Sequence, residues 1–532
     1  MNPYKLFYQK KIQLSSIILF IFSTISYSQD NSMLKLDPDL LVMLKESQNI
    51  HKQLDDKLFP NWEFNKTPIL FYKPKCQELL VNFPHKPKGF EEYKGFNPLT
   101  NQPIYVRNDK TFFDWDDQNT TTEIDGVKVL VVADTYSSMR AQLRGAILNQ
   151  SKDFLNTWLD NWDFIGSPYH KISTILHEGF HVYQEQLAEG KNANEGTVAL
   201  YPLLNPTNNS LSVIEGLILK DALTAKNQEV ILEKAKQFIA VRSHRQALLD
   251  SVFVAYENLN EFSEGTAKYI EFKFFSQGEA LIPIDEMKYV NGFTDYKKEL
   301  PAFFNRQLED LVNIVAVNDN RFGNKFGAGP LRFKLYYLGA CQGLLLDKIL
   351  PKWKEQIFDK GIYLSDLLEK TIKLSDKDKK RLLDITKIEY NYDKIFKEKI
   401  QFESEGQEMI KRKVDAILKT EETLVIIDYK GHKYAGMNYT PFGVTRVDAN
   451  STIYEMTPIG IYFDKIPELK SKMVFPVLLN KKQQKIYFSI STSIEDFKEG
   501  LVENSLSVKE FEFIADEINV KKEGNRIIIS FK

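Results

Sequence analysis

Two histidines and the glutamate between them form the segment of this sequence best suited to chemistry. His177 and His181 are four residues apart in the run His177-Glu178-Gly179-Phe180-His181. In a helix, residues four apart lie on one face, so both imidazoles can reach one ion at roughly 2.0 to 2.1 Å. Glu178 projects at about 100° from His177, and therefore reaches a water on the ion rather than the ion itself. The pattern predicts a Zn²⁺ site in which Glu178 acts as the catalytic base.

The residues around this motif favour a buried helix. Apolar residues recur at helical spacing between residues 169 and 188. They are Ile172, Ile175, Leu176, Phe180 and Tyr183. Three of the seven histidines of the chain lie between residues 170 and 181. One alternative stays open, namely two surface histidines on a solvated helix.

A catalytic zinc site needs a third protein ligand and one open position. Downstream of the motif, three carboxylates stand at helical spacing on one face: Glu257, Glu261 and Glu264. Acids stacked in this way repel each other by a few tenths of a kcal/mol per pair unless a cation offsets the repulsion. The segment is therefore a candidate source of the third ligand.

The motif and the segment Glu264-Gly265-Thr266-Ala267 together resemble the gluzincin metallopeptidases, whose second motif often reads EGxA. They also resemble exported bacterial proteins with HExxH and EGxAxY signatures. The resemblance implies a metallopeptidase with Glu264 as third ligand, and a further acid or polar group that holds a ligand histidine. The spacing departs from the family, because 82 residues, 182 to 263, separate His181 from Glu264. An inserted pair of helices would account for this.

Other acids compete for the third position, so we rank Glu264 first, Glu261 second and Glu215 third. Glu215 lies in a predicted helix at 211–225 and also suits a partner to an imidazole N–H. Glu195 follows a polar run and is interpreted as an acid at a helix start.

A developing oxyanion needs a donor besides zinc. The candidates are Tyr269, Tyr336, Tyr337, Arg332 and His170. His244 and His432 are interpreted as ordinary surface or core histidines.

The elements that position these residues are predicted to form an α+β fold of more than one domain, because 532 residues exceed one ordinary core. We expect a mainly helical, zincin-like catalytic body, a small N-terminal sheet and a β-rich C-terminal domain. The predicted parts are a signal peptide (1–28), a mixed α/β N-terminal part of the catalytic region (29–135), the helical zinc-binding catalytic region (136–398) and the C-terminal domain (399–532). Amphipathic helices are predicted near 138–160, 169–188, 212–226, 228–276, 298–317 and 330–350.

Short β-prone runs are predicted to form the two sheets. They lie at 68–72, 104–106, 122–132, 424–429, 461–463, 485–489 and 526–530. Asp125-Gly126 predicts a tight hairpin turn. An edge strand of this hairpin would suit an extended peptide, although plain sheet structure explains the same residues. Gly339, Ala340 and Gly343 suggest close helix packing or room for substrate, and we favour packing.

Export is predicted from lysines at 5, 10 and 11, followed by an apolar run too short to span a bilayer. The mature protein is expected in the periplasm or outside the cell, with no membrane attachment after the signal is removed; an N-terminal membrane anchor is the alternative. Charges balance at 70 Lys plus Arg against 72 Asp plus Glu, which argues against nucleic acid as a partner. Cys76 and Cys341 either pair or remain as two free thiols. The oligomeric state is left open.

The leading hypothesis is hydrolysis of a peptide bond in a peptide or protein substrate. A zinc hydrolase of another amide or ester is the first alternative, because activated water attacks any polarised carbonyl. The second is an exported binding protein without catalysis. The presence of Glu178 argues against it, since a structural metal site needs ligands but no base.

Overall fold

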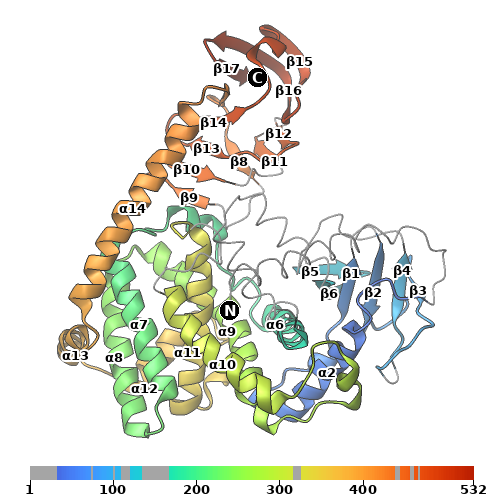
Figure 1. The fold of residues 1–532 in the computed structure, drawn as a ribbon, viewed down its shortest axis with the longest axis vertical. Helices are drawn as coiled ribbons and strands as arrows, with labels where there is room; N and C mark the ends of the chain where they lie inside the picture. Colours follow the sequence, from blue (N-terminus) through green and yellow to red (C-terminus); the bar gives the residue numbers. More distant parts are fainter. Residues whose placement is uncertain are drawn as a thin grey trace, which may run out of the picture.

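The structure, a computed structural model, describes residues 33–73, 76–99, 102–108, 120–134, 167–315, 325–437, 444–455, 460–464 and 468–532. The predicted signal peptide and the predicted helix at 138–160 lie outside these residues. Within them the α+β fold class is confirmed. A small N-terminal sheet, a helical body and a large C-terminal sheet follow one another (Figure 1).

Six described strands form the N-terminal sheet. In spatial order they are β3 (Glu91–Glu92), β4 (Tyr105–Asn108), β2 (Gln77–Val81), β1 (Ile69–Lys73), β6 (Val127–Ala133) and β5 (Thr120–Ile124). β1 and β6 run parallel, and the other neighbours are antiparallel. The predicted hairpin is confirmed as β5 and β6. Its turn residues Asp125 and Gly126 have φ of 45° and 77°, the positive values of a tight turn that matches the twist of the strands.

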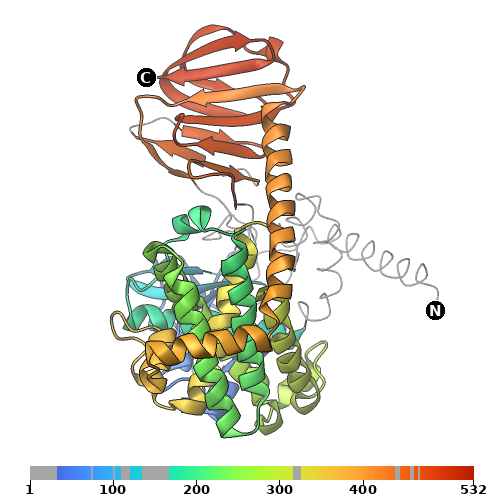
Figure 2. The ribbon, with the colours of Figure 1, turned by 90° about the vertical axis from the view of Figure 1, so that its left-hand side faces the viewer.

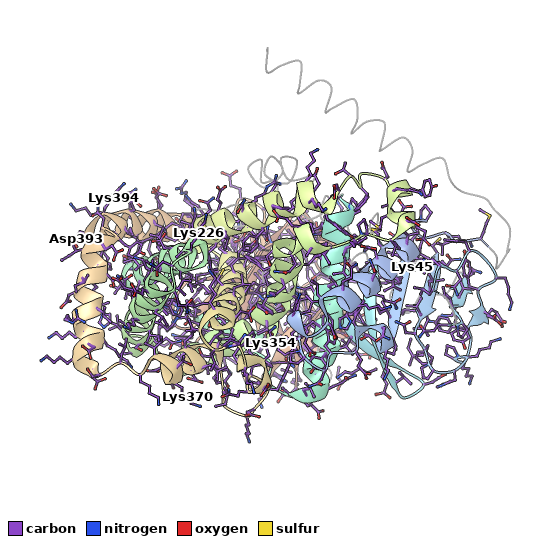
Figure 3. All side chains as sticks on the ribbon, turned by 90° about the horizontal axis from the view of Figure 1, so that it is seen from below. Lys45, Lys226, Lys354, Lys370, Asp393 and Lys394 are labelled. Carbon is purple, nitrogen blue, oxygen red and sulfur yellow. The ribbon has the colours of Figure 1, made fainter. Side chains whose placement is uncertain are left out.

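The two faces of this sheet belong to different cores, because successive side chains of a strand point to opposite sides. Phe71 and Val132 face the main core, together with α2 (Leu40–Leu54) and α6 (Pro168–Leu187). Tyr72 and Val131 face a smaller core on the other side. Lys45 of α2 pairs with Glu286 of η5 (Asp285–Tyr289) at 2.5 Å, on the side of the molecule seen in Figure 3.

The helical body is the largest part of the described chain. Its helices are α7 (Pro206–Thr224), α8 (Gln228–Ala247), α9 (Ser251–Ser276), α10 (Tyr296–Val315), α11 (Ala328–Ile349), α12 (Leu364–Ile372) and α13 (Asp376–Glu389). Helix α9 packs against both α6 and α11, and α6 lies between the body and the small sheet (Figure 1).

Helices α9 and α11 cross at two glycines. A Cβ on Gly265 would lie 2.7 Å from the Cα of Gly339, and one on Gly339 would lie 2.6 Å from the Glu261 carbonyl oxygen. Farther along, a Cβ on Gly343 would come within 2.9 Å of the Tyr269 ring. The small residues of α11 therefore serve close helix packing, as favoured from the sequence.

A long helix, α14 (Tyr392–Leu418), leads from the body to the C-terminal sheet (Figure 2). The predicted boundary at 399 falls inside this helix, and the first strand begins at Thr423. In order the strands are β8 (Tyr434–Met437), β11 (Gly460–Phe463), β12 (Glu468–Ser471), β16 (Phe511–Glu523), β17 (Arg526–Phe531), β7 (Thr423–Asp428), β14 (Lys485–Ile490), β13 (Val477–Asn480), β10 (Ser451–Tyr454) and β9 (Val444–Arg446), with β15 (Gly500–Ser507) beside β16. The predicted runs at 424–429, 461–463, 485–489 and 526–530 are confirmed as β7, β11, β14 and β17.

The C-terminal sheet shares a hydrophobic core with one end of the body. Tyr201, Tyr256 and the start of α11 join this core with apolar residues of the strands. Arg446 of β9 also donates a hydrogen bond to the carbonyl of Leu200, the last residue of η3 (Glu195–Leu200). The sheet therefore packs on the body and is not merely tethered to it.

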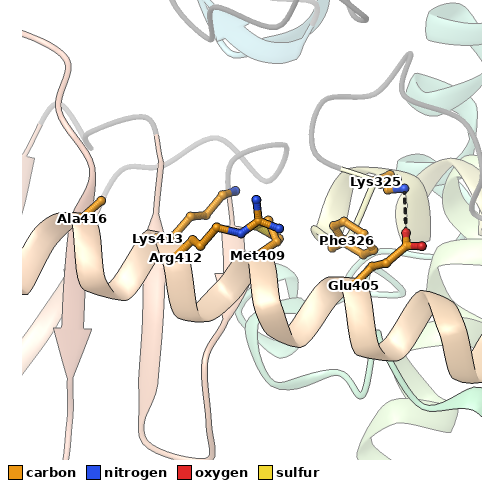
Figure 4. A pocket seen from close by; sticks show the side chains of 7 residues that line it. All are labelled: Lys325, Phe326, Glu405, Met409, Arg412, Lys413 and Ala416. Atoms are coloured by element: carbon orange, nitrogen blue, oxygen red, sulfur yellow. Dashed lines mark hydrogen bonds and ion pairs between the residues drawn. The ribbon is translucent and has the colours of Figure 1, made fainter.

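A second junction lies where α14 passes the loop before α11. It contains a hollow of about 550 Å³ (Figure 4). The hollow is lined by Lys325, Phe326, Glu405, Met409, Arg412, Lys413 and Ala416. Lys325 pairs with Glu405 at 3.3 Å, Arg412 with Glu408 at 3.3 Å, and Lys413 with Glu455. Each cation that lines the hollow thus already has a carboxylate partner.

Two remaining predictions concern the cysteines and the membrane. In the described structure Cys76 and Cys341 form no disulfide, and Cys341 is buried. Among the described helices, none combines the length and the apolar content needed to cross a bilayer.

Candidate metal centre

Helix α6 carries the two histidines of the motif. It begins at Pro168, and the preceding Ser167 side chain accepts a hydrogen bond from the His170 backbone N–H, as a helix N-cap does. Its apolar face is buried as predicted. Gly179, within the motif, is needed for packing, because a Cβ there would lie 2.5 Å from the Phe64 ring. The motif helix is therefore pressed closely against the N-terminal segment.

Three potential ligand atoms converge beside α6. The Nε2 atoms of His177 and His181 lie 3.2 Å apart, and Glu264 Oε2 of α9 lies 3.6 Å and 3.5 Å from them. A tetrahedral zinc site with ligand distances of roughly 2.0 to 2.1 Å has ligand atoms about 3.3 to 3.4 Å from one another. Both the donor set and its spacing fit Zn²⁺. The three leading candidates from the sequence are thus brought together.

Each imidazole is held through its other nitrogen. His177 Nδ1 lies 2.7 Å from Glu271 Oε1, and Glu271 in turn pairs with Lys268 at 2.8 Å. His181 Nδ1 lies 2.7 Å from Gln184 Oε1. Such contacts fix the ring orientation, so that both Nε2 atoms face the common point.

These outer partners were missed from the sequence. Glu271 stands seven residues after Glu264 and so on the same side of α9, which is a usable signal. Gln184, three residues after His181, is uncharged and carries no comparable signal. The predicted imidazole partner, Glu215, is wrong in this role, since it pairs with Arg245 at 2.7 Å and with Arg242 at 3.0 Å.

The second-ranked ligand, Glu261, also faces arginine and not histidine. Its carboxylate lies 2.9 Å from Arg242 Nη1 and accepts a hydrogen bond from Gln342 at 2.8 Å. Glu257, one turn earlier, pairs with Arg245 at 2.7 Å. The repulsion expected among the stacked acids of α9 is therefore offset by two arginines and, at Glu264, by two imidazoles.

The ionisation of the cluster reflects these contacts. Burial alone would lower the pKa of His177, but hydrogen bonds to Glu264 and Glu271 raise it to about 10. His181 has a raised pKa because its hydrogen bond to Glu264 outweighs burial. Burial would raise the pKa of Glu264, yet the two imidazoles hold it well below its ordinary value. The cluster thus stabilises positive charge at its centre.

The outer oxygen of Glu264 faces α11. Glu264 Oε1 lies 3.6 Å from Arg332 Nη2, and the Tyr336 hydroxyl donates a hydrogen bond to the same carboxylate. Burial and the Glu264 charge raise the pKa of Tyr336 well above its ordinary value, which keeps the hydroxyl protonated. Arg332 Nε also lies 3.4 Å from Glu195 of η3. Arg332 and Tyr336 are thus beside the cluster.

Two of the other proposed oxyanion donors, Tyr269 and Tyr337, donate to side chains outside the cluster. The Tyr269 hydroxyl donates to Asp347 at 2.8 Å, and the Tyr337 hydroxyl donates to Gln307 at 3.0 Å. His170 lies on α6, where burial lowers its pKa to about 4. Among the proposed donors, Tyr336 and Arg332 contact the carboxylate of Glu264.

Glu178 lies next to the cluster without joining it. It is half-buried, and its negative charge adds to the rise in the pKa of both histidines. Within the described residues it makes no hydrogen bond or ion pair to another side chain. Its carboxylate is therefore available to a water or a substrate at the cluster.

The β5–β6 hairpin lies along α6. Thr121 Oγ1 is 3.3 Å from Glu185 Oε1, and Lys128 pairs with the same carboxylate. Among the described strands, β5 is the outermost on this side of the sheet. The hairpin predicted as a substrate-aligning edge is therefore next to the motif helix.

Known proteins give no further guide to the site. Comparison with protein-family models, curated proteins and solved structures finds no match to this chain.

Proposed function

We propose that the chain is an exported zinc-dependent hydrolase, and in particular a metallopeptidase, with His177, His181 and Glu264 as the zinc ligands. One observation carries the proposal: two imidazole nitrogens and a carboxylate oxygen converge within 3.2 to 3.6 Å of one another. The hydrogen bonds to the far nitrogens support it, because ligand histidines are usually held in this way.

Bound zinc would supply the Lewis acid that acidifies a water and polarises the substrate carbonyl. Glu178 then accepts the proton of the attacking water and delivers it to the leaving amine. Its half-buried, unpaired carboxylate beside the histidines supports this role.

Two hydrogen-bond donors of α11 are proposed to bind the carbonyl oxygen of the substrate. As the carbonyl carbon is attacked, its oxygen gains negative charge, which needs a fixed hydrogen-bond donor. The Tyr336 hydroxyl and the Arg332 guanidinium both contact the carboxylate of Glu264. They are proposed to stabilise this oxygen, with Tyr336 as the neutral donor and Arg332 as the charged one.

A peptide is the proposed substrate, because strand β5 lies along the motif helix and extended chains bind readily to strand edges. Export of the protein remains part of the proposal and rests on the lysines and the apolar run at the start of the chain.

The test compares the wild type with Glu178→Gln, using zinc analysis and a broad peptide-library digest. We expect zinc in both proteins and a rate about 10² to 10⁴ times lower in the variant. The matched control is Glu189→Gln, an exposed acid just beyond the same helix, which should leave the rate unchanged.

Other outcomes would overturn parts of the proposal. Cleavage that survives Glu178→Gln would remove Glu178 as the base. Zinc without cleavage of any peptide, but with turnover of simple esters or amides, would favour the broader hydrolase. Zinc without any turnover would favour a binding protein.

A further inference from the structure

One buried glutamine connects the motif helix to the helix of the third ligand. Gln184 Nε2 lies 2.6 Å from Thr266 Oγ1, 2.9 Å from the Ser263 carbonyl oxygen and 3.1 Å from the Phe262 carbonyl oxygen. Thr266 donates its own hydroxyl hydrogen to the Phe262 carbonyl at 2.6 Å, so its oxygen accepts from Gln184. With three acceptors on this side, the amide has one orientation, in which the NH₂ group faces α9.

This orientation fixes the tautomer of neutral His181. The Gln184 oxygen faces His181 Nδ1 at 2.7 Å, and an amide oxygen can only accept a hydrogen bond. Nδ1 therefore carries the hydrogen, and the lone pair of Nε2 faces His177 Nε2 and Glu264 Oε2. Four polar groups are thus linked in series: the Phe262 carbonyl, the Thr266 hydroxyl, the Gln184 amide and the His181 imidazole. Together they place the hydrogen of neutral His181 on Nδ1.

The same side chain sets the distance between two of the proposed ligands. Ser263, whose carbonyl accepts from Gln184, directly precedes Glu264. His181 and Glu264 are separated by 82 residues, 182 to 263, so no local geometry places them together. Gln184 therefore connects the two helices next to both ligands, through the imidazole of His181 on α6 and the carbonyl of Ser263 on α9.

We propose that Gln184 is a positioning residue for zinc: it holds the tautomer of His181 and the register of α6 against the Glu264 turn of α9. This inference rests on the proposed metal site and adds a determinant of its affinity. His177 is held differently, by the Glu271 carboxylate, so the two histidines have a charged and a neutral outer partner respectively.

The experiment uses the full chain with Gln184→Leu, which keeps the volume and removes every hydrogen bond. Zinc affinity is measured by competition with a chromophoric chelator, and Co²⁺ is added to record the visible absorption of the site. We expect zinc affinity to fall about 10- to 100-fold, as for other outer-sphere changes, with an altered Co²⁺ spectrum. Gln186→Leu, an exposed position on the same helix, should match the wild type in both measurements.

Thr266→Val provides a second variant if Gln184→Leu does not fold. It removes the nearest acceptor of Gln184 and should weaken zinc binding in the same direction, by less. Unchanged affinity and spectrum in a folded variant would overturn the role of Gln184. A wild type that binds no zinc would instead overturn the proposed function, so the two failures are distinguishable.

Discussion

Helix α9 carries two groups of buried or half-buried glutamates that are neutralised in different ways. In its first half, Glu257 and Glu261 face Arg245 and Arg242 of α8. In its second half, Glu264 and Glu271 face the two imidazoles of α6. The two groups are neighbours on one helix, because Glu261 of the first stands three residues before Glu264 of the second.

The difference lies in the counter-charges. Arginine is always protonated, so the first group is complete without any ion from solution. With Glu215 and Lys334 it holds three carboxylates and three cations, all buried. Imidazoles are neutral or charged, and they exchange a proton for a metal ion. The second group is therefore where the proposed zinc ion would add stability.

Removing an arginine that pairs with the first group should give the largest loss of stability. Arg245→Met removes the buried partner of Glu257 and Glu215 and leaves both carboxylates without it. We expect the free energy of unfolding in urea to fall by about 3 to 5 kcal/mol. Exposed Arg412→Met should change it by less than about 0.5 kcal/mol. Equal effects of the two substitutions would contradict the comparison.

The pH dependence of the same group gives a second test. Burial would raise the pKa of Glu257, but Arg245 lowers it to about 2, below its ordinary 4.5. Its stabilising effect is therefore present above pH 4.5 and lost as the pH falls toward 2, and amounts to about 3 kcal/mol. The difference in unfolding free energy between wild type and Glu257→Gln should shrink over this interval. A difference that stays constant would show that Glu257 is not held ionised.

Removing metal tests the second group. Zinc that binds only the folded chain should add about 2.7 kcal/mol to the free energy of unfolding when its free concentration is 100 times its Kd. Dialysis against a chelator should remove this increment, and added zinc should restore it. His181→Ala should show the lower stability with or without zinc. An equal response in this variant would place the bound metal elsewhere.

The smallest loss of stability is expected from a substitution at Gly265, directly after Glu264 on α9. Gly265→Ala adds a Cβ only 2.7 Å from Gly339 Cα, so α11 must shift away. Overpacking of this kind costs about 1 to 3 kcal/mol. Because Gly265 follows Glu264, zinc affinity should fall as well. Ser263→Ala, which adds no atom, should leave zinc affinity unchanged. A stable Gly265→Ala with normal zinc affinity would contradict the tight contact.

The sequence predicted those parts that depend on local geometry. The motif His177 to His181 indicated its helix and shared face because residues four apart must align there. Asp125-Gly126 indicated its hairpin because few residues accept two positive φ values. The short β-prone runs likewise predicted the two sheets, and the amphipathic periodicity of the middle region predicted the helical body.

Long-range packing decided the rest. Glu215 was proposed as an imidazole partner because nothing local shows that Arg242 and Arg245 lie against it. Gln184 and Glu271 escaped notice because their roles exist only once α6 lies on α9. The boundary predicted at 399 fell inside α14. The amphipathic pattern of this helix continues to Leu418, and the first strand begins only at Thr423.

The proposed ligand set is tested most directly by counting zinc in folded protein after Glu264→Gln and after Glu261→Gln, two substitutions less than one turn apart on α9. We expect one zinc ion per chain in the wild type and in Glu261→Gln, and none in Glu264→Gln. Zinc retained after Glu264→Gln, or lost only after Glu261→Gln, would contradict it.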